Sequence, residues 1–157
     1  YGIRSCSLRL TNTYGPNMRI KDARQTFLGV WFKNLLRGAP LEVYGNGAQL
    51  RDFNYVDDVV SAMKLCAMSS MADGQVFNLG GNDVVSLIDL AELMVALTNG
   101  KYTVIDFPED RKKIDIGDYY SDFTKINRAV GWSPKIELSK GLKKTFDYFL
   151  KNSTHYL

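Results

Sequence analysis

Short strand-like segments alternate with longer helix-like segments along the 157 residues of this chain. The strand-like segments are rich in β-branched, aromatic and other apolar residues, and they lie at 5–10, 41–44, 50–55, 75–79 and 102–107. Apolar residues at helical spacing mark the segments at 27–37, 57–68, 87–98, 122–131 and 139–150. This alternation predicts an α/β fold with some parallel strands, because an intervening helix returns the chain to the same end of the sheet. No internal repeat or linker interrupts the pattern, so we expect one domain.

Several residues are typical of the ends of these helices. Gly38 is expected to end the first helix and Gly131 the fourth, because glycine tolerates the left-handed backbone that follows a last helical turn. The residues interpreted as N-caps are Asp57, Ser139 and the pair formed by Ser86 and Asp89.

The same periodicities predict which side chains face the core. Cys6, Leu8 and Leu10 are expected to share one face of the first strand. Met63 and Leu150 are expected on the buried faces of their helices. Residues 13–17 are interpreted as a turn.

Composition excludes several classes of function. The 20 Lys and Arg residues against 17 Asp and Glu give a formal charge of +3, which is too small and too scattered for a nucleic-acid binder. The run at 111–113 is interpreted as solvated surface. No apolar run reaches the ~18 residues of a membrane span, and Cys6 and Cys66 suggest no disulfide framework or zinc site, so a cytoplasmic location is expected. The single histidine, His155, argues against histidine-based catalysis or metal binding.

Pattern alone offers one candidate binding residue. Gly45 and Gly47 flank Asn46 in a tight-turn sequence between two strands, and like the pair Gly80 and Gly81 they lack the spacing of a dinucleotide fingerprint. Arg51 follows this turn inside an apolar strand. Two interpretations of Arg51 remain open. It forms bidentate hydrogen bonds to a phosphate or carboxylate of a ligand, or it forms an ordinary surface salt bridge.

Four blocks of sequence, in order, resemble the nucleotide-sugar epimerases, 4,6-dehydratases and uronate decarboxylases of the extended short-chain dehydrogenase/reductase family. Residues 9–16 are similar to the family signature R-x-x-N-x-Y-G-P. Residues 37–58 are similar to G-x-P-L-x-V-Y-G-x-G-x-Q-x-R-D-F-x-Y-V-D-D, which is highly specific. Residues 77–81 and 122–134 match two further blocks, so the resemblance covers nearly the whole chain.

The resemblance implies that this chain is the carboxy-terminal part of a Rossmann-type enzyme, with the last parallel strands and a small α/β substrate-binding subdomain. In such enzymes an amino-terminal Rossmann domain binds NAD, and a Tyr-x-x-x-Lys pair transfers protons. No tyrosine here has a lysine four residues later, and no Gly-x-x-Gly-x-x-Gly is present. Because the chain also starts at Tyr1 directly before a strand, we expect residues 1–157 to be a nucleotide-sugar-binding domain that lacks catalytic residues, with the NAD-binding domain absent.

The resemblance also implies residues that contact the phosphates and the cofactor. Asn12 matches an asparagine near the phosphates, and Arg51 matches the arginine that clamps the pyrophosphate. The family has a second arginine in the segment that corresponds to 111–118, and Arg111 is the candidate for it here. Residues 115–118 differ from the sequence R-P-G-D that is more common in the family. Thr11 occupies a position near the nicotinamide.

The nucleotide base is expected between a helix start and a strand. By the resemblance, Phe27 and Leu28 match the helix start that packs near the base. Val43 and Tyr44 match the strand whose backbone reads uracil or thymine. The implied ligand is therefore a UDP- or dTDP-sugar.

Two functions follow as hypotheses. The chain is the sugar-nucleotide-binding half of an NAD-dependent 4-epimerase or 4,6-dehydratase, with catalysis requiring the amino-terminal domain. The alternative is a free-standing, non-catalytic binding or interaction module, which would cover its exposed apolar face by forming a homodimer.

Overall fold

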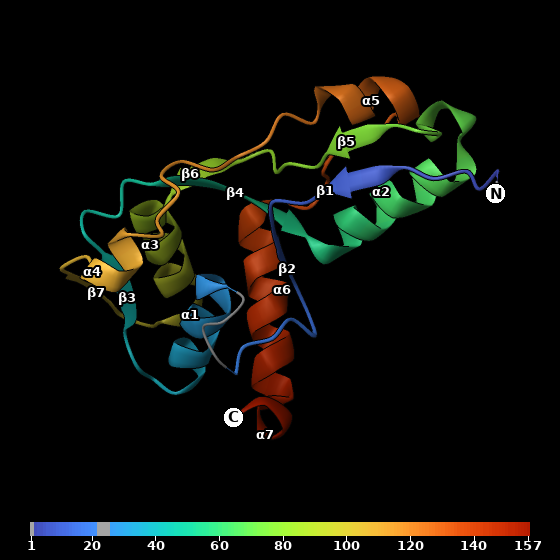
Figure 1. Ribbon diagram of the computed structural model, residues 1–157. Helices are drawn as coiled ribbons and strands as arrows, with labels where there is room; N and C mark the ends of the chain where they lie inside the picture. The colour runs from blue at the N-terminus through green and yellow to red at the C-terminus, as the bar shows by residue number, and fades with distance from the viewer. Residues whose placement is uncertain (1, 22–25) are drawn as a thin grey trace.

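The computed structural model describes residues 2–21 and 26–157, so Tyr1, on which the expectation about the chain's start depends, lies outside the described residues. Helices and strands alternate as the sequence predicts (Figure 1). The elements are β1 (Ser7–Arg9), β2 (Asn12–Tyr14), α1 (Phe27–Leu36), β3 (Leu41–Tyr44), β4 (Leu50–Tyr55), α2 (Val56–Met68), the 3-10 helix η1 (Ser70–Ala72), β5 (Val76–Asn78), β6 (Val84–Ser86), α3 (Leu87–Thr98), β7 (Tyr102–Ile105), α4 (Glu109–Lys112), α5 (Thr124–Val130), α6 (Leu138–Lys151) and α7 (Ser153–Tyr156).

The strands form three small sheets in which most pairs are parallel, which confirms the α/β class. β1 pairs with β5, β2 with β4, and β3 with β7, all in parallel. β6 joins β4 antiparallel, so that β4 is the central strand of the order β2-β4-β6. Each parallel pair joins segments far apart in sequence, as parallel pairing requires.

Two hydrophobic cores correspond to two ends of the molecule. The larger core lies among α1, α3, α6, β3 and β4, and it contains Tyr14, Trp31, Phe32, Leu41, Val43, Leu90, Met94 and Phe149. The smaller core lies among α2, β5 and α5, and it contains Val59, Ala62, Cys66, Phe77, Leu79, Ile126 and Trp132. In Figure 1, β4 extends between the two ends and α6 packs beside it.

The close packing of α6 depends on a glycine. A Cβ atom added at Gly141 would lie 2.1 Å from the Tyr14 hydroxyl and 3.1 Å from the Tyr55 ring. Because no side chain fits there, α6 can approach β2 and β4 more closely than a helix with a side chain at this position.

Several predicted helix ends are confirmed. Gly38 follows the end of α1 and Gly131 ends α5, with left-handed φ values of 67° and 70°. Ser86 caps α3, and its side chain accepts the Asp89 N–H at 3.1 Å.

Two predicted caps are wrong. α2 begins after Tyr55, so Asp57 lies within the first turn, where its charge suits the helix dipole but its side chain caps nothing. α6 begins after Glu137, so Ser139 is a helical residue and not a cap.

Some predicted turns and faces are also wrong. Residues 12–14 form β2, and the turn starts only at Gly15. Leu10, Met63 and Leu150 are 38%, 50% and 57% exposed, because the cores lie on the other faces of their segments. The sequence did not predict β6, α4 or α7.

The glycine turn at 45–47 does not make a hairpin. Gly47 N–H donates to Tyr44 O at 3.2 Å, so a tight turn is present. The strands on either side of it pair with other partners, β3 with β7 and β4 with β2 and β6. The turn therefore moves the chain from one sheet to another.

Within the described residues, no helix is both long enough and apolar enough to cross a membrane.

Candidate functional site

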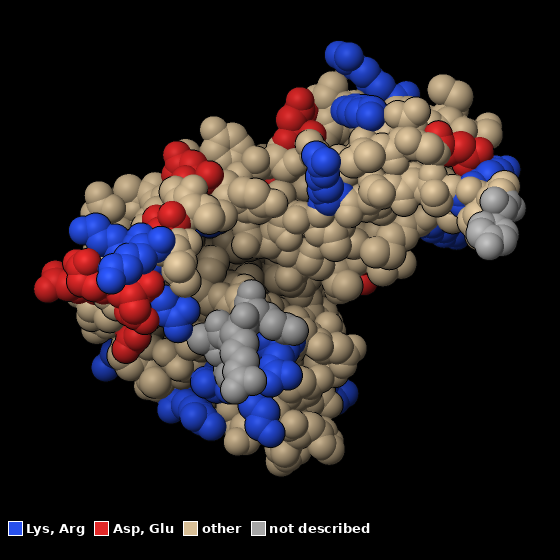
Figure 2. All heavy atoms as spheres, viewed as in Figure 1, with Lys and Arg blue, Asp and Glu red and all other residues tan. Residues whose placement is uncertain are grey.

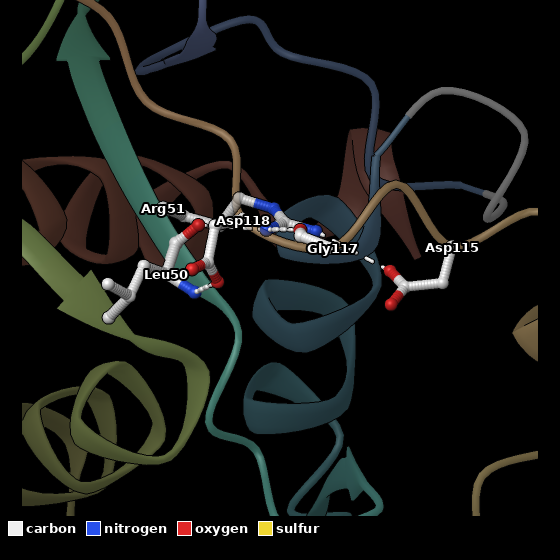
Figure 3. A network of polar contacts seen from close by, with 5 residues as sticks. All are labelled: Leu50, Arg51, Asp115, Gly117 and Asp118. Carbon is white, nitrogen blue, oxygen red and sulfur yellow. Dashed lines mark hydrogen bonds and ion pairs between the residues drawn. The ribbon is translucent and has the colours of Figure 1, made fainter.

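Arg51 lies in β4 and is buried, with only 8% of its surface exposed. Its guanidinium donates hydrogen bonds to the backbone carbonyls of Leu50, at 2.8 Å, and Gly117. The guanidinium also forms an ion pair with Asp115, with 3.6 Å between Nη2 and Oδ1. Figure 3 shows these contacts, which join β4 to the segment after α4. The guanidinium is therefore held in place by residues far from it in sequence.

A cavity of about 250 Å³ opens beside Arg51, between α1, β3 and the segment that contains α4. Its apolar lining is Phe27, Val30, Trp31, Tyr44, Leu87, Phe107 and Ile114, and its polar lining is Asn34, Glu42, Gln49, Arg51, Arg111 and Asp115. The Tyr44 and Phe107 rings lie 5.7 Å apart, and those of Phe27 and Trp31 lie 5.2 Å apart. Aromatic walls with a few polar groups are typical of a small-molecule site.

A second, more open hollow adjoins the first. Thr11 and Asn12 line it, together with residues of the loop before α1. Phe27, Arg51 and Asp115 line both hollows, so the two meet at the guanidinium. One ligand could therefore occupy both hollows and contact Arg51 at its middle.

A buried polar network around Asp52 lies behind Arg51, because successive side chains of β4 point to opposite faces. Asp52 Oδ2 accepts the N–H groups of Gly81, at 3.0 Å, and Ser121, at 3.2 Å. The side-chain amide of Asn12 donates to Asp52 O at 2.9 Å. Burial raises the pKa of the Asp52 carboxyl above its usual value, and the hydrogen bond from Gly81 acts in the opposite direction. The network joins β2, β4 and two loops at one point.

The residues expected around the phosphates and cofactor lie close to these hollows. Arg51 and Arg111 both line the aromatic cavity, but Arg111 belongs to the exposed helix α4 and pairs with Asp110 at 3.8 Å. Asn12 and Thr11 line the adjoining hollow, and the Thr11 hydroxyl lies 3.2 Å from the side-chain amide of Asn54.

The residues expected around the base divide into two groups. Phe27 and Tyr44 line the aromatic cavity. Leu28 and Val43 are core residues, 1% and 0% exposed, so their side chains pack inward.

Charges of both signs cover the α4 region, which borders the aromatic cavity through Arg111. Figure 2 shows acidic and basic side chains interspersed over the α4 region. The sequence there contains Glu109, Asp110, Arg111, Lys112 and Lys113. The run at 111–113 is exposed, as its interpretation as solvated surface predicts. In the described part of the chain, no three His, Cys, Asp or Glu side chains gather closely enough to hold a metal ion.

Sequence reasoning missed Asp52, Phe107, Gln49 and Asp115 as residues of the site. Phe107 ends a predicted strand, and Gln49 and Asp52 belong to the motif that contains Arg51, so these three carried a signal. Asp115 carried a weaker signal: residues 115–118 occupy the place of the family sequence R-P-G-D, but an aspartate where the family has arginine did not indicate a contact with Arg51.

Residues 1–80, about half of the chain, match the family described as the NAD dependent epimerase/dehydratase family. The chain belongs to this family, in agreement with the resemblance to extended short-chain dehydrogenases/reductases. Solved structures of nucleotide-sugar epimerases match nearly the whole chain over about half of their own length, which confirms that this chain is part of a Rossmann-type fold.

Curated relatives match over almost the whole chain. An uncharacterized protein of Methanocaldococcus jannaschii is 34% identical over 97% of the chain. UDP-glucuronic acid decarboxylase 1 of Xenopus tropicalis is 33% identical over 98%, and the dTDP-glucose 4,6-dehydratase of Salmonella typhimurium is 29% identical over 98%. These matches cover 44%, 35% and 43% of the three relatives, so the chain spans less than half of their length.

Among solved structures, the UDP-glucose 4-epimerase of Thermotoga maritima with UDP-glucose is 30% identical, with a TM-score of 0.85 over 98% of the chain and 48% of the epimerase. The UDP-glucuronic acid 4-epimerase of Bacillus cereus, in complex with UDP-glucuronic acid and NAD, is 26% identical, with a TM-score of 0.77 over 94% of the chain and 45% of the epimerase.

Proposed function

We propose that this chain is the nucleotide-sugar-binding part of an NAD-dependent nucleotide-sugar 4-epimerase or 4,6-dehydratase, and that it binds a UDP- or dTDP-sugar in the two hollows that meet at Arg51. The observation that carries the proposal is a buried arginine at the junction of an aromatic cavity and a polar hollow. The family membership supports it, and so do relatives and structural neighbours named for nucleotide-sugar reactions.

The chemistry of each hollow suits one part of such a ligand. The aromatic cavity, with Phe27, Tyr44 and Phe107, offers flat apolar walls to a pyrimidine base. Arg51 offers planar N–H donors to the diphosphate. The open hollow beside Asn12 and Thr11 leaves room for the sugar. Each charge-assisted hydrogen bond from the arginine contributes about 1.5–3 kcal/mol.

The described residues form only part of an NAD-dependent site. The sequence contains neither the Gly-x-x-Gly-x-x-Gly fingerprint nor a Tyr-x-x-x-Lys pair, and Thr11 is its one candidate near a nicotinamide. NAD would supply hydride transfer at the sugar in the parent enzyme. In our proposal this chain binds and orients the nucleotide sugar, and NAD binding requires the amino-terminal domain.

Calorimetry with UDP and dTDP tests the proposal. We expect the wild-type chain to bind at least one of them weakly, and to bind no NAD. Arg51→Ala and Arg51→Lys should both lose roughly tenfold or more in affinity, because lysine cannot reproduce the planar fork. Arg128→Ala is the matched control, since Arg128 is exposed on α5, in the part of the fold built on the smaller core. An affinity unchanged in both Arg51 variants would refute the site.

The alternative is a free-standing binding module, which would have to cover its exposed apolar side chains without an amino-terminal domain. Val60, Met68 and Met71, on α2 and η1, are 56%, 75% and 66% exposed. In the first proposal the amino-terminal domain would cover these side chains. A chain acting alone would cover them in a homodimer, because exposed apolar side chains favour association. Sedimentation of a folded monomer at high concentration would contradict the alternative.

A further inference from the structure

Arg51 is already paired within this chain. Besides its two backbone carbonyl partners, the guanidinium faces the carboxylate of Asp115 at 3.6 Å. The Arg51 side chain is 9% exposed and the Asp115 side chain 27% exposed, so the pair lies at the boundary between the site and solvent. An anionic ligand bound to the guanidinium would therefore lie beside this carboxylate; Figure 3 shows the pair.

The segment that carries Asp115 is attached to β4 at its far end. Asp118 Oδ1 accepts the Leu50 N–H at 2.8 Å, and the Tyr119 N–H donates to Leu50 O at 2.9 Å. Toward α4, the Asp115 N–H reaches Lys112 O only at 3.4 Å, which is long for a hydrogen bond. The Asp115 side chain, which is 27% exposed, can therefore turn away from the guanidinium while Gly117 and Asp118 keep the segment on β4.

The Asp115 contact is also weaker than the contact a phosphate could make. At 3.6 Å the carboxylate is an ion-pair partner outside hydrogen-bond distance, whereas a phosphate oxygen can approach a guanidinium to about 2.8 Å. The two anions cannot share the guanidinium without repelling each other at short range. Because Asp115 lines both hollows, its carboxylate remains close to the ligand even when the side chain has turned away from Arg51.

We infer that Asp115 competes with the ligand's phosphate groups for Arg51, and thereby sets the affinity and charge preference of the phosphate-binding part of the site. The inference rests on the proposed function and deepens it. When a ligand binds, a phosphate group replaces Asp115 as the anionic partner of Arg51. The measured affinity therefore reflects the difference in free energy between the phosphate contact and the Asp115 contact.

Asp115→Asn tests this inference. UDP affinity, measured by calorimetry at low ionic strength, should rise on the order of tenfold, because the amide removes the competing charge and keeps the shape. Asp115→Ser is a second variant with the same expected direction. Glu109→Gln is the matched control: it removes one negative charge from α4, six residues earlier, at an exposed side chain that lines neither hollow.

The outcomes separate this inference from the proposed function. A gain in UDP affinity in the two Asp115 variants that clearly exceeds the gain in Glu109→Gln supports the inference. Equal gains in UDP affinity in the Asp115 variants and the control would mean that any nearby negative charge weakens binding. A loss of UDP affinity in the Asp115 variants would mean that Asp115 positions Arg51. Either result overturns the inference. If wild type binds UDP through Arg51 and the Asp115 variants do not differ from the control, the proposed function stands and the inference fails. If none of these proteins binds UDP or dTDP, the proposed function itself fails, and the inference with it.

Discussion

Replacing Asp52 by alanine is expected to lower the free energy of unfolding by about 3 kcal/mol. Asp52 is fully buried in β4, and its Oδ2 accepts two backbone N–H groups, from Gly81 and Ser121. Alanine leaves both donors without a partner. It would also release the loop that carries Ser121, and with it the segment that covers Arg51.

The magnitude follows from these two bonds. A buried donor without a partner costs about 1–3 kcal/mol, so two donors cost about 2–6 kcal/mol. Ser121 is only half-buried, so water can replace part of its bond, and alanine also removes the cost of burying a carboxylate. Both corrections lower the value toward 3 kcal/mol, which is a large share of the stability of a typical domain.

Asp52→Asn separates the hydrogen bonds from the charge. The asparagine oxygen can still accept both N–H groups, so we expect a smaller loss at neutral pH. Burial raises the pKa of Asp52 in the folded chain. The folded state therefore holds this proton more tightly than the unfolded state does, and the contribution of Asp52 to stability is greatest below its unfolded pKa of about 3.9 and falls as pH rises through the folded pKa. The stability of Asp52→Asn relative to wild type should increase over that range.

Urea unfolding followed by circular dichroism, at pH 4 and pH 7, measures both effects. Asp83→Ala, an exposed aspartate in the loop after Gly81, is the matched control and should stay within about 0.5 kcal/mol of wild type. A loss below 1 kcal/mol in Asp52→Ala, or a difference between Asp52→Asn and wild type that does not change with pH, would refute this account of the network.

Two further predictions concern packing and thiol reactivity. Gly141→Ala should destabilise the chain by about 1 kcal/mol in urea unfolding, because crowding of the Tyr14 hydroxyl costs about 1–3 kcal/mol and the gain in helix propensity returns ~1 kcal/mol. A stabilised variant would show that α6 can move away from β2. Burial raises the pKa of the Cys66 thiol to about 11, and the neighbouring Cys6 adds to the shift. Alkylation of Cys66, followed by mass spectrometry, should therefore be slow at pH 8 and accelerate toward pH 11, because the thiolate is the reactive form. Rapid labelling at pH 8 in the folded chain would contradict this.

The sequence predicted most local structure correctly. Gly131 and Ser86 mark helix ends because their effects act within one helical turn, through a left-handed backbone conformation and a side-chain hydrogen bond. The predicted caps at Asp57 and Ser139 lie two residues after the observed caps, Tyr55 and Glu137. Errors of this size are expected, because the boundaries of helices are defined only to within one or two residues.

Sheet pairing could not be read from the local sequence. The Gly45 to Gly47 turn between two strands is compatible with a hairpin, yet β3 pairs with β7 and β4 with β2. Met63 and Leu150 fit their helical patterns but lie outside the cores, because each core covers only part of its helix. Which partner a strand selects depends on the summed burial of the whole chain.

By itself, the sequence determined the class of fold, the family and the arginine on which the proposed site depends, since each is encoded in short contiguous patterns. Only the tertiary structure decided what surrounds that arginine. Asp115 and Gly117 lie more than sixty residues from Arg51 in sequence and meet it because the segment after α4 lies along β4. A contact between remote segments is fixed by how the two cores pack, and no local pattern contains that information.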